Sequence, residues 1–470
     1  MILPRNKRRL FLGAGGLILA ALGLLLLARL KFTGLVMSAL LHLGGASEIS
    51  LSVTQASPWR VVVADLRFQV RTQVFSARRV TISRRHWWAP SLGAVQVEQA
   101  RVPVTIDGSD TNAINWATYQ NSRAKVQPWQ VPLDELAVDG ELVVQAAALP
   151  AQVLTGKIAA RLLPQKNWEF RVQTDGPGLA VQAEGSYDVA KDDLTFKVPG
   201  MALDLKIWQN YVQRLNLLPG GPWELEGQVT GRAEGRLLSK QFTATGAVRL
   251  REGRAASRQR AILGEGIEAD LEFSDLAQIT SKPGHLRIRE LRTGRLVLRG
   301  LEAELALRGA SKIAVSHASF QILGGTVALE PFAYFPALRE LETVVLIDGV
   351  SLAEVMALTR DLPALVSGRL SGRCPIRIDD GGLRFGPGSL ELKPGVPAQL
   401  QFTAGDRRKL RLTELHLAIR PPGAPPGCSA QLHIAGVPDD GEGNAPIVLD
   451  VNVTGPLERY LHLDLESPLR

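Results

Sequence analysis

From residue 48 onward, apolar and polar residues alternate with a period of two in many short runs. In residues 66–71, Leu, Phe and Val alternate with Arg, Gln and Arg, and residues 49–54 and 301–308 follow the same rule. Successive side chains of a strand point to opposite faces, so each run predicts a strand with one apolar and one wet face. Turn pairs such as Ser57-Pro58 and Asp139-Gly140 separate the runs.

The whole chain predicts a mainly β fold. The runs amount to roughly 22 to 26 strands, with no alternation of strand and long helix that would indicate a parallel α/β sheet. We therefore expect one long antiparallel sheet. A flat sheet of that width would curl or split. Its apolar face is then covered by a second sheet, or it lines a groove that accepts an apolar ligand.

The N-terminal stretch 10–28 reads LFLGAGGLILAALGLLLLA and carries no charge. As a helix it would be roughly 28 Å long, enough to cross the hydrocarbon core of a bilayer. Four basic residues precede it and two follow: Arg5, Lys7, Arg8, Arg9, Arg29 and Lys31. The denser cluster lies on the N-terminal side, which predicts a cytoplasmic N-terminus and a translocated remainder.

A cleaved signal peptide is the alternative for this stretch. Its apolar core would be shorter, and a small-x-small cleavage site would follow. Here the run ends in Arg29-Leu30-Lys31-Phe32. We therefore expect an uncleaved single-pass anchor.

Three short helices are predicted behind this anchor. Residues 33–43 are amphipathic, and this helix either lies on the outer leaflet or closes the first end of the sheet; we favour the second. Residues 203–217 precede Pro219-Gly220-Gly221-Pro222. Ser351 and Glu354 form a capping box for the third helix. The polar segment 112–130 predicts a long loop or a short helix.

Composition narrows the class of partner. The chain is 45% hydrophobic and 21% charged, which is typical of a folding sequence. The net charge of +8 suggests a polyanion, but residues 1–47 hold six basic and no acidic side chains. The remainder is nearly balanced. The excess charge therefore belongs to the anchor and indicates no nucleic-acid surface.

The sequence shows no catalytic or metal-binding motif. We find no Walker A loop, G-x-S-x-G, H-E-x-x-H or helix-opening G-x-G-x-x-G. Asp379-Asp380 and Asp439-Asp440 adjoin glycines and are typical of solvated turns. Cys374 and Cys428 either form a disulfide or are separate buried thiols; we favour the second. We expect neither an enzyme, nor a metal, nor a cofactor.

Three segments in the last third of the chain carry a family resemblance. They read FQILGGTV (320–327), VLIDGVSL (345–352) and VSGRLSGRCPIRIDDGGL (366–383), and an Ala-Arg-Arg-Val stretch occupies 77–80. The sequence resembles the YdbH-like branch of the AsmA-like proteins. The resemblance implies a sheet rolled into a long apolar groove, a β-taco, that moves phospholipids between the inner and outer membranes of diderm bacteria.

This resemblance and the period-two pattern together define the expected site. The partners would be phospholipid acyl chains and the inner membrane, with the bulk of the chain periplasmic. Arg67 and Glu304 should lie on the opposite, wet face. The expected groove-facing residues are Leu66, Phe68, Val70, Leu305, Leu307 and Leu346. The arginines expected to contact headgroups are Arg369, Arg373 and Arg377, which share one strand face.

The expected division of the chain has five parts. They are a tail and anchor (1–31), a short helix (32–47), and N-terminal (48–200), central (201–315) and C-terminal YdbH-like (316–470) groove portions. The alternative function is an envelope assembly factor or scaffold whose sheet edge pairs with a client protein.

Overall fold

The computed structural model describes most of the chain from residue 29 to residue 454. The described residues are 29–39, 41–42, 46–70, 73–84, 92–106, 133–146, 151–163, 167–188, 190–214, 222–238, 241–259, 261–294, 296–336, 338, 340–358, 364–379, 382–402, 409–420, 429–439 and 446–454. The expected anchor at 10–28, the polar segment 112–130 and Cys428 lie outside them. Among the described residues, no helix has the length and apolar character needed to cross a bilayer.

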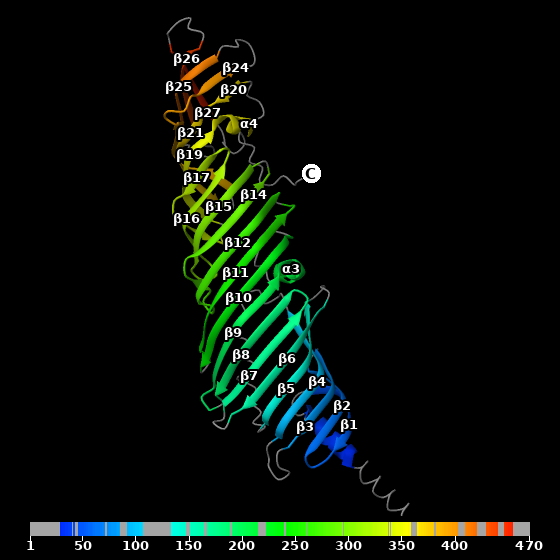
Figure 1. The fold of residues 1–470 in the computed structure, drawn as a ribbon. Coiled ribbons are helices and arrows are strands. Elements are labelled where there is room, and N and C mark those ends of the chain that lie inside the picture. Colours follow the sequence, from blue (N-terminus) through cyan, green and yellow to red (C-terminus); the bar gives the residue numbers. More distant parts are fainter. Residues whose placement is uncertain are drawn as a thin grey trace, which may run out of the picture. The chain divides into compact units, whose positions relative to one another are not determined.

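The described strands, 27 in number, belong to a single mixed sheet, so the mainly β prediction is confirmed (Figure 1). Because all of them lie in one sheet, no second sheet of described strands packs across it. The chain divides into two compact units: unit 1 comprises Met1–Ala202 and Glu234–Phe242, and unit 2 comprises Leu203–Ala233 and Thr243–Arg470.

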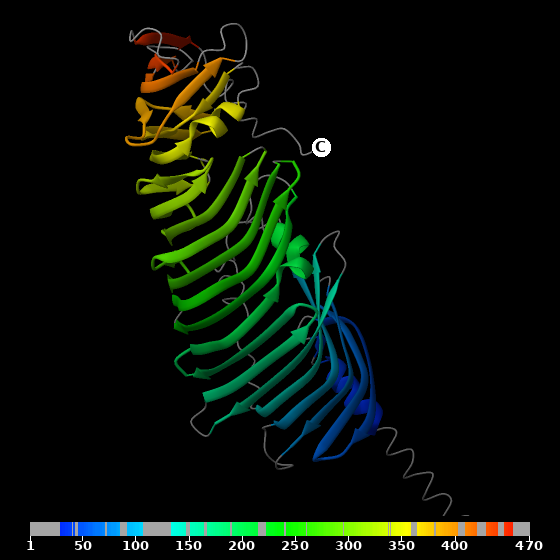
Figure 2. The ribbon, with the colours of Figure 1, turned by 45° about the horizontal axis from the view of Figure 1, so that its top comes forward.

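Unit 1 is built mainly from nine strands that follow one another along the chain (Figure 2). Their bounds are β1 Ala46–Ala56, β2 Arg60–Val70, β3 Gln73–Ser83, β4 Leu92–Ile106, β5 Leu133–Ala146, β6 Gln152–Leu162, β7 Asn167–Gly176, β8 Leu179–Asp188 and β9 Asp193–Asp204. The end of β10 and the first residues of β11 also belong to this unit.

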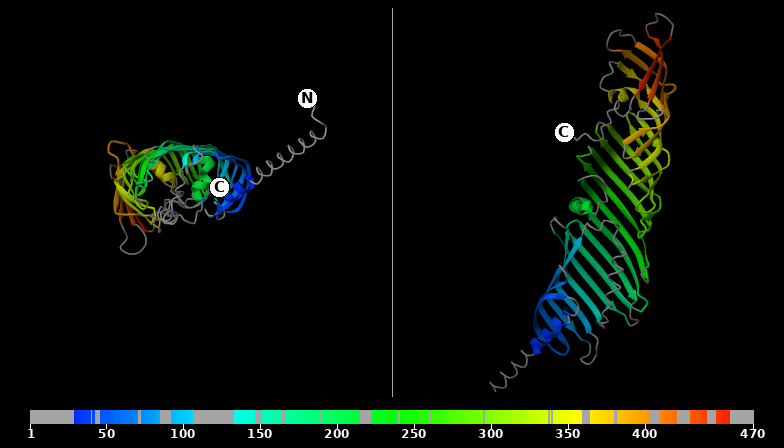
Figure 3. Two further views of the ribbon diagram at one scale, coloured as in Figure 1. Left: turned by 90° about the horizontal axis from the view of Figure 1, so that it is seen from below. Right: turned by 180° about the vertical axis from the view of Figure 1, so that it is seen from behind.

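Unit 2 contains the remaining strands, of which β12, β14, β15 and β16 form a ladder of neighbours (Figure 3). The bounds are β10 Glu224–Leu238, β11 Gln241–Ser257, β12 Ile262–Asp275, β13 Thr280–Ser281, β14 Gly284–Thr293, β15 Leu296–Leu307, β16 Ile313–Ile322, β17 Gly325–Leu329, β18 Phe332–Phe335, β19 Glu340–Ser351, β20 Ala364–Ser367, β21 Arg369–Asp379, β22 Gly382–Phe385, β23 Gly388–Leu392, β24 Gln399–Phe402, β25 Lys409–Arg420, β26 Ser429–Pro438 and β27 Ile447–Thr454.

The expectation of a purely antiparallel sheet is wrong where β4 meets β5. Strands β4 and β5 pair in parallel, with Val97 opposite Val138 and Val102 opposite Leu142. A parallel pair needs a connection long enough to return the chain to the same end of the sheet. Residues 107–132 provide that length between the two strands.

The three expected helices are present. Residues 29–39 and 41–42 are helical, so the first helix begins earlier than predicted. Helix α3 spans Leu205–Arg214, and Asp204 caps it by accepting a hydrogen bond from the Lys206 amide. Helix α4 spans Leu352–Leu358, and the Ser351 hydroxyl accepts from the Glu354 amide, as half of a capping box does.

The C-terminal end of unit 2 is filled by its own side chains. Leu352 of α4 packs with leucines of β21, β24 and β25, and Met356 adds to this cluster. The leucines are buried, and Met356 is partly buried. The helix is therefore part of a closed core, with Leu352 and Met356 facing inward as its sequence predicts.

Candidate functional site: the apolar face of the sheet

An unbroken row of apolar side chains crosses unit 1 at right angles to its strands. Each residue of the row is the pairing partner of the next, and every strand from β1 to β8 contributes one. The row consists of Val53, Val63, Val80, Val97, Val138, Ile158, Val172 and Ala183. Directly opposed side chains on one face of a sheet are in contact. The row is therefore a continuous apolar stripe.

Exposure varies along this row. Val63 is 1% exposed and packs with Ala77 and Val80 in a buried cluster, whereas Ile158 is 39% exposed. Side chains sandwiched between two sheets would be buried throughout. The row thus passes through a filled core at Val63 and Val80 and continues onto a face that the described residues cover only in part.

The first helix covers the end of the row that lies on β1, which is called the closed end below. It passes so near to β1 that a Cβ atom added at Gly34 would lie 3.4 Å from Val53 Cγ2 and 3.6 Å from Leu51 Cδ1. Val53 belongs to the apolar row, so the helix lies on the apolar side of β1. This is the position that our interpretation of the helix as a closure of the sheet requires.

Large apolar side chains are half-buried on β7 and β8. Trp168 is opposite Tyr187, and Phe170 is opposite Gly185. A Cβ atom added at Gly185 would lie 2.5 Å from Phe170 Cζ and 2.2 Å from the Thr195 carbonyl oxygen. Glycine is therefore required at this position by the Thr195 carbonyl oxygen and by the ring that lies over it.

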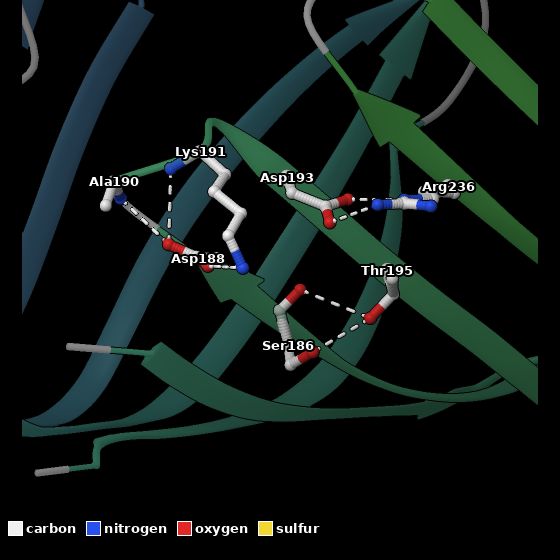
Figure 4. A network of polar contacts seen from close by, with 7 residues as sticks. All are labelled: Ser186, Asp188, Ala190, Lys191, Asp193, Thr195 and Arg236. Carbon is white, nitrogen blue, oxygen red and sulfur yellow. Dashed lines mark hydrogen bonds and ion pairs between the residues drawn. The ribbon is translucent and has the colours of Figure 1, made fainter. Parts of the chain in front are cut away.

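The turn from β8 to β9 is held by polar contacts (Figure 4). Asp188 accepts hydrogen bonds from the amides of Ala190 and Lys191, at 2.9 and 3.2 Å, and Lys191 Nζ lies 3.2 Å from its carboxylate. These contacts lower the pKa of Asp188, while burial opposes the shift. The hydroxyls of Ser186 and Thr195 are 2.8 Å apart. The contacts fix the turn beside the half-buried aromatic face.

Unit 2 has a comparable row with smaller side chains. Again each member pairs with the next, from β11 to β21. The row consists of Leu250, Ala269, Leu286, Ala303, Ala318, Leu329, Val345 and Cys374. Ala318 and Cys374 are buried, and the others are half-buried. No polar residue interrupts the row.

Ion pairs occupy the opposite face of the same strands. Arg249 Nε lies 2.8 Å from Asp270, and Arg287 lies 3.4 Å from Glu302. These residues alternate with members of the apolar row. Exposed pairs of this kind contribute little to stability. Their effect is to keep one face wet while the other stays apolar.

A hollow of about 660 Å³ lies over β4–β8. Its lining includes five members of the apolar row, which are Val97, Val138, Ile158, Val172 and Ala183, together with their neighbours in sequence. The hollow therefore adjoins the apolar row.

The first three expected groove residues lie on β2. Leu66 packs against the cluster around Val63, and Phe68 stacks on Phe75 with ring centroids 5.3 Å apart. Val70 is half-buried beside Ala46 and Gln73. Leu66 and Phe68 are thus close to the closed end of the row, while Arg67 between them is exposed.

The other three expected groove residues do not all share a face. Leu305 and Leu307 are half-buried and alternate with Ala303 of the row. Leu346 is 40% exposed and pairs with Arg373, whereas its neighbour Val345 belongs to the row. Leu346 therefore points to the polar face, and the groove-facing residue at this place is Val345.

The three arginines of β21 are exposed on one strand face, but each has a partner. Arg369 Nη1 donates to the carbonyl oxygens of Gly324 and Gly349, both at 2.8 Å. Arg373 lies 3.3 Å from Glu330, and Arg377 lies 2.7 Å from Glu340. These contacts tie strands together. Contact with a lipid headgroup stays a prediction.

Sequence reasoning did not identify the middle of the unit 1 row. Val138, Ile158 and Val172 lie in runs that predict strands, and their alternation was visible. Their alignment depends on which strands pair and in which register, and the parallel β4–β5 pair sets that register. A hydrophobic period alone cannot supply it.

This geometry defines a class of protein. No group of His, Cys, Asp or Glu in the described residues could hold a metal ion. A sheet that carries a half-buried apolar row in each of its two units is suited to holding apolar molecules. Residues 135–395, more than half of the chain, match the YdbH-like family, described as intermembrane phospholipid transport protein YdbH.

The chain therefore belongs to the YdbH-like family, as its C-terminal segments indicate. The family is one of lipid transport and is not known for enzymatic activity. Comparison with curated proteins and with solved structures gives no match.

Proposed function

We propose that this protein carries phospholipids between two membranes with their acyl chains lying along the apolar face. The observation that supports this most directly is the row from Val97 to Ala183. It crosses five neighbouring strands without a polar residue and stays partly exposed.

The energetics of such a face suit transport. Shielding a methylene group from water is worth up to about 0.8 kcal/mol, so an acyl chain gains substantially by lying on the row. Neighbouring strands are about 4.8 Å apart and present similar side chains. A chain that slides by one strand exchanges one valine or alanine contact for another, with little net change in energy.

The polar parts of the lipid would remain in water at the rim of the face. The uncharged stretch 10–28 would anchor the protein in the inner membrane, with its N-terminus cytoplasmic and the sheet in the periplasm. In this arrangement phospholipid is the cargo and no cofactor takes part.

A photocrosslinking amino acid tests the proposal directly. Placed at Val172, it would lie in the apolar row, and at the neighbouring Gln173 it would lie on the opposite face. We expect phospholipid adducts at 172 and few at 173, measured by mass spectrometry of the irradiated full-length protein. Equal lipid labelling at both positions, or none at 172, would contradict the proposal.

A second candidate function rests on the last described strand. Among the described strands, β27 pairs only with β26, and its Ile447, Val448 and Leu449 are exposed large apolar residues. An unpaired apolar edge can add a strand from another chain. An assembly factor that binds a client here would give protein adducts from a crosslinker at Val448, and lipid adducts there would argue against it.

A further inference from the structure

The first helix is apolar on two opposite sides. At about 100° per residue, four small or apolar residues gather on one side and four on the other. The half-buried side consists of Leu30, Gly34, Met37 and Leu41. The exposed side consists of Phe32, Leu35, Val36 and Ala39.

The half-buried side accounts for the packing within the protein. Gly34 lies against Leu51 and Val53 of β1, and His42 Nδ1 lies 3.0 Å from the Ala46 carbonyl oxygen at the start of that strand. The helix therefore runs antiparallel to β1. Residue 29 points toward the turn between β1 and β2.

The exposed side has no partner among the described residues that would account for its composition. Phe32 and Leu35 are each 69% exposed, and Val36 is also exposed. A helix with polar residues on its outer side would suffice to cover β1. An apolar outer side indicates a second apolar environment.

The charged residues around the exposed side of the helix indicate what that environment is. No acidic residue occurs before Glu48, and Arg29 and Lys31 flank the exposed side at its N-terminal end. The uncharged stretch 10–28 directly precedes residue 29 in the sequence. An apolar side rimmed by cations, without acidic residues, suits the surface of an anionic bilayer.

An aromatic side chain lies at the same end of the strands. Trp59, in the β1–β2 turn, is 51% exposed, and its carbonyl oxygen accepts a hydrogen bond of 2.8 Å from the Arg84 amide. Tryptophan prefers the boundary between headgroups and hydrocarbon. Arg60 and Arg84, both exposed, add positive charge beside it.

We propose that Phe32, Leu35 and Val36 rest in the surface of a lipid bilayer and set the first strands of the sheet against it. The inference adds a docking surface to the proposed function and rests on it only in placing the protein at a membrane. One helix would then join two apolar regions, the bilayer on its outer side and the closed end of the Val53–Ala183 row on its inner side.

The test compares two positions on this helix in the full-length protein. The protein is reconstituted into vesicles of phosphatidylcholine and phosphatidylglycerol, with a photocrosslinking amino acid at Leu35 or at Met37. We expect lipid adducts at 35 in several-fold excess over 37, and crosslinks within the chain at 37.

A third sample with the crosslinker at Val172 separates this inference from the transport proposal. Lipid capture at 172 with protein adducts or no adduct at 35 would overturn the docking surface and leave transport standing. Lipid capture at 35 without capture at 172 would support the docking surface and count against transport. Equal lipid labelling at 35 and 37 would also overturn the docking surface, because the two sides of the helix would then be equivalent.

Discussion

Arg236 holds both carboxylate oxygens of Asp193 (Figure 4). Its Nε and Nη2 donate to Oδ1 and Oδ2 at 2.8 and 2.7 Å, the paired geometry in which a guanidinium matches a carboxylate. Asp193 begins β9 and Arg236 lies near the end of β10, within unit 1. The arginine lowers the pKa of Asp193 through these hydrogen bonds and its charge.

This ion pair makes the stability of unit 1 depend on pH. Because the folded-state pKa of Asp193 lies below its unfolded value, the contribution is fully present above about pH 5 and is lost as the pH falls through the folded value. We expect Asp193→Asn to lower the melting temperature slightly at pH 7 and less at lower pH. The control is Asp175→Asn on β7. Thermal unfolding of the unchanged protein and of both variants, at pH 7 and at lower pH, checks the expectation. A difference in melting temperature between Asp193→Asn and the unchanged protein that does not vary with pH would contradict it.

A charge in the apolar row should stop transport. We expect Val172→Arg to abolish rescue of an envelope lipid defect while the protein still accumulates, because an acyl chain would have to desolvate the guanidinium to pass. Gln173→Arg places the same residue on the wet face and should rescue normally. Normal rescue by both variants would count heavily against the row as a lipid path.

The same reasoning applies to unit 2. Leu305→Arg puts a cation beside Ala303 of the second row, and Thr326→Arg puts one on the exposed face of β17. We expect loss of lipid transport only for Leu305→Arg, measured as phospholipid exchange between vesicle populations. If Leu305→Arg transports at the normal rate, the apolar face of unit 2 is not part of the path.

The close approach of Phe170 to Gly185 predicts a stability effect. Gly185→Ala should destabilise by about 1–3 kcal/mol, because the new methyl group meets the ring and the Thr195 carbonyl. Gly200→Ala is the matched control, since a Cβ atom there would have no heavy atom within 4 Å. Denaturant titration measures both. An equal effect at the two positions would mean that the crowding at Gly185 is relieved.

The pattern of the sequence predicted most of the strands and helices. This was possible because the apolar face of a strand and the cap of a helix depend on residues that are close together in the sequence. The alternation in residues 168–174 and the helix cap at Ser351 both correspond to what the structure contains, although the Ser351 amide donates to the Leu323 carbonyl oxygen and not to Glu354. Leu346 shows what the sequence pattern could not predict. It lies in a run of four apolar residues, 344–347, where a period of two cannot say which pair faces inward. Its pairing with Arg373 decides the question, and that pairing is set far away in sequence.

The parallel pairing of β4 and β5 also has a consequence for how quickly the sheet assembles. Its partners are separated by residues 107–132, whereas β7 and β8 are joined by a tight turn. Closing the longer loop costs more entropy before any contact is gained. We expect two ribbons of hairpins to form first and to meet along this seam last. A chain stalled at that stage would present two unpaired edges rich in valine, which is the stage at which a chaperone would be needed.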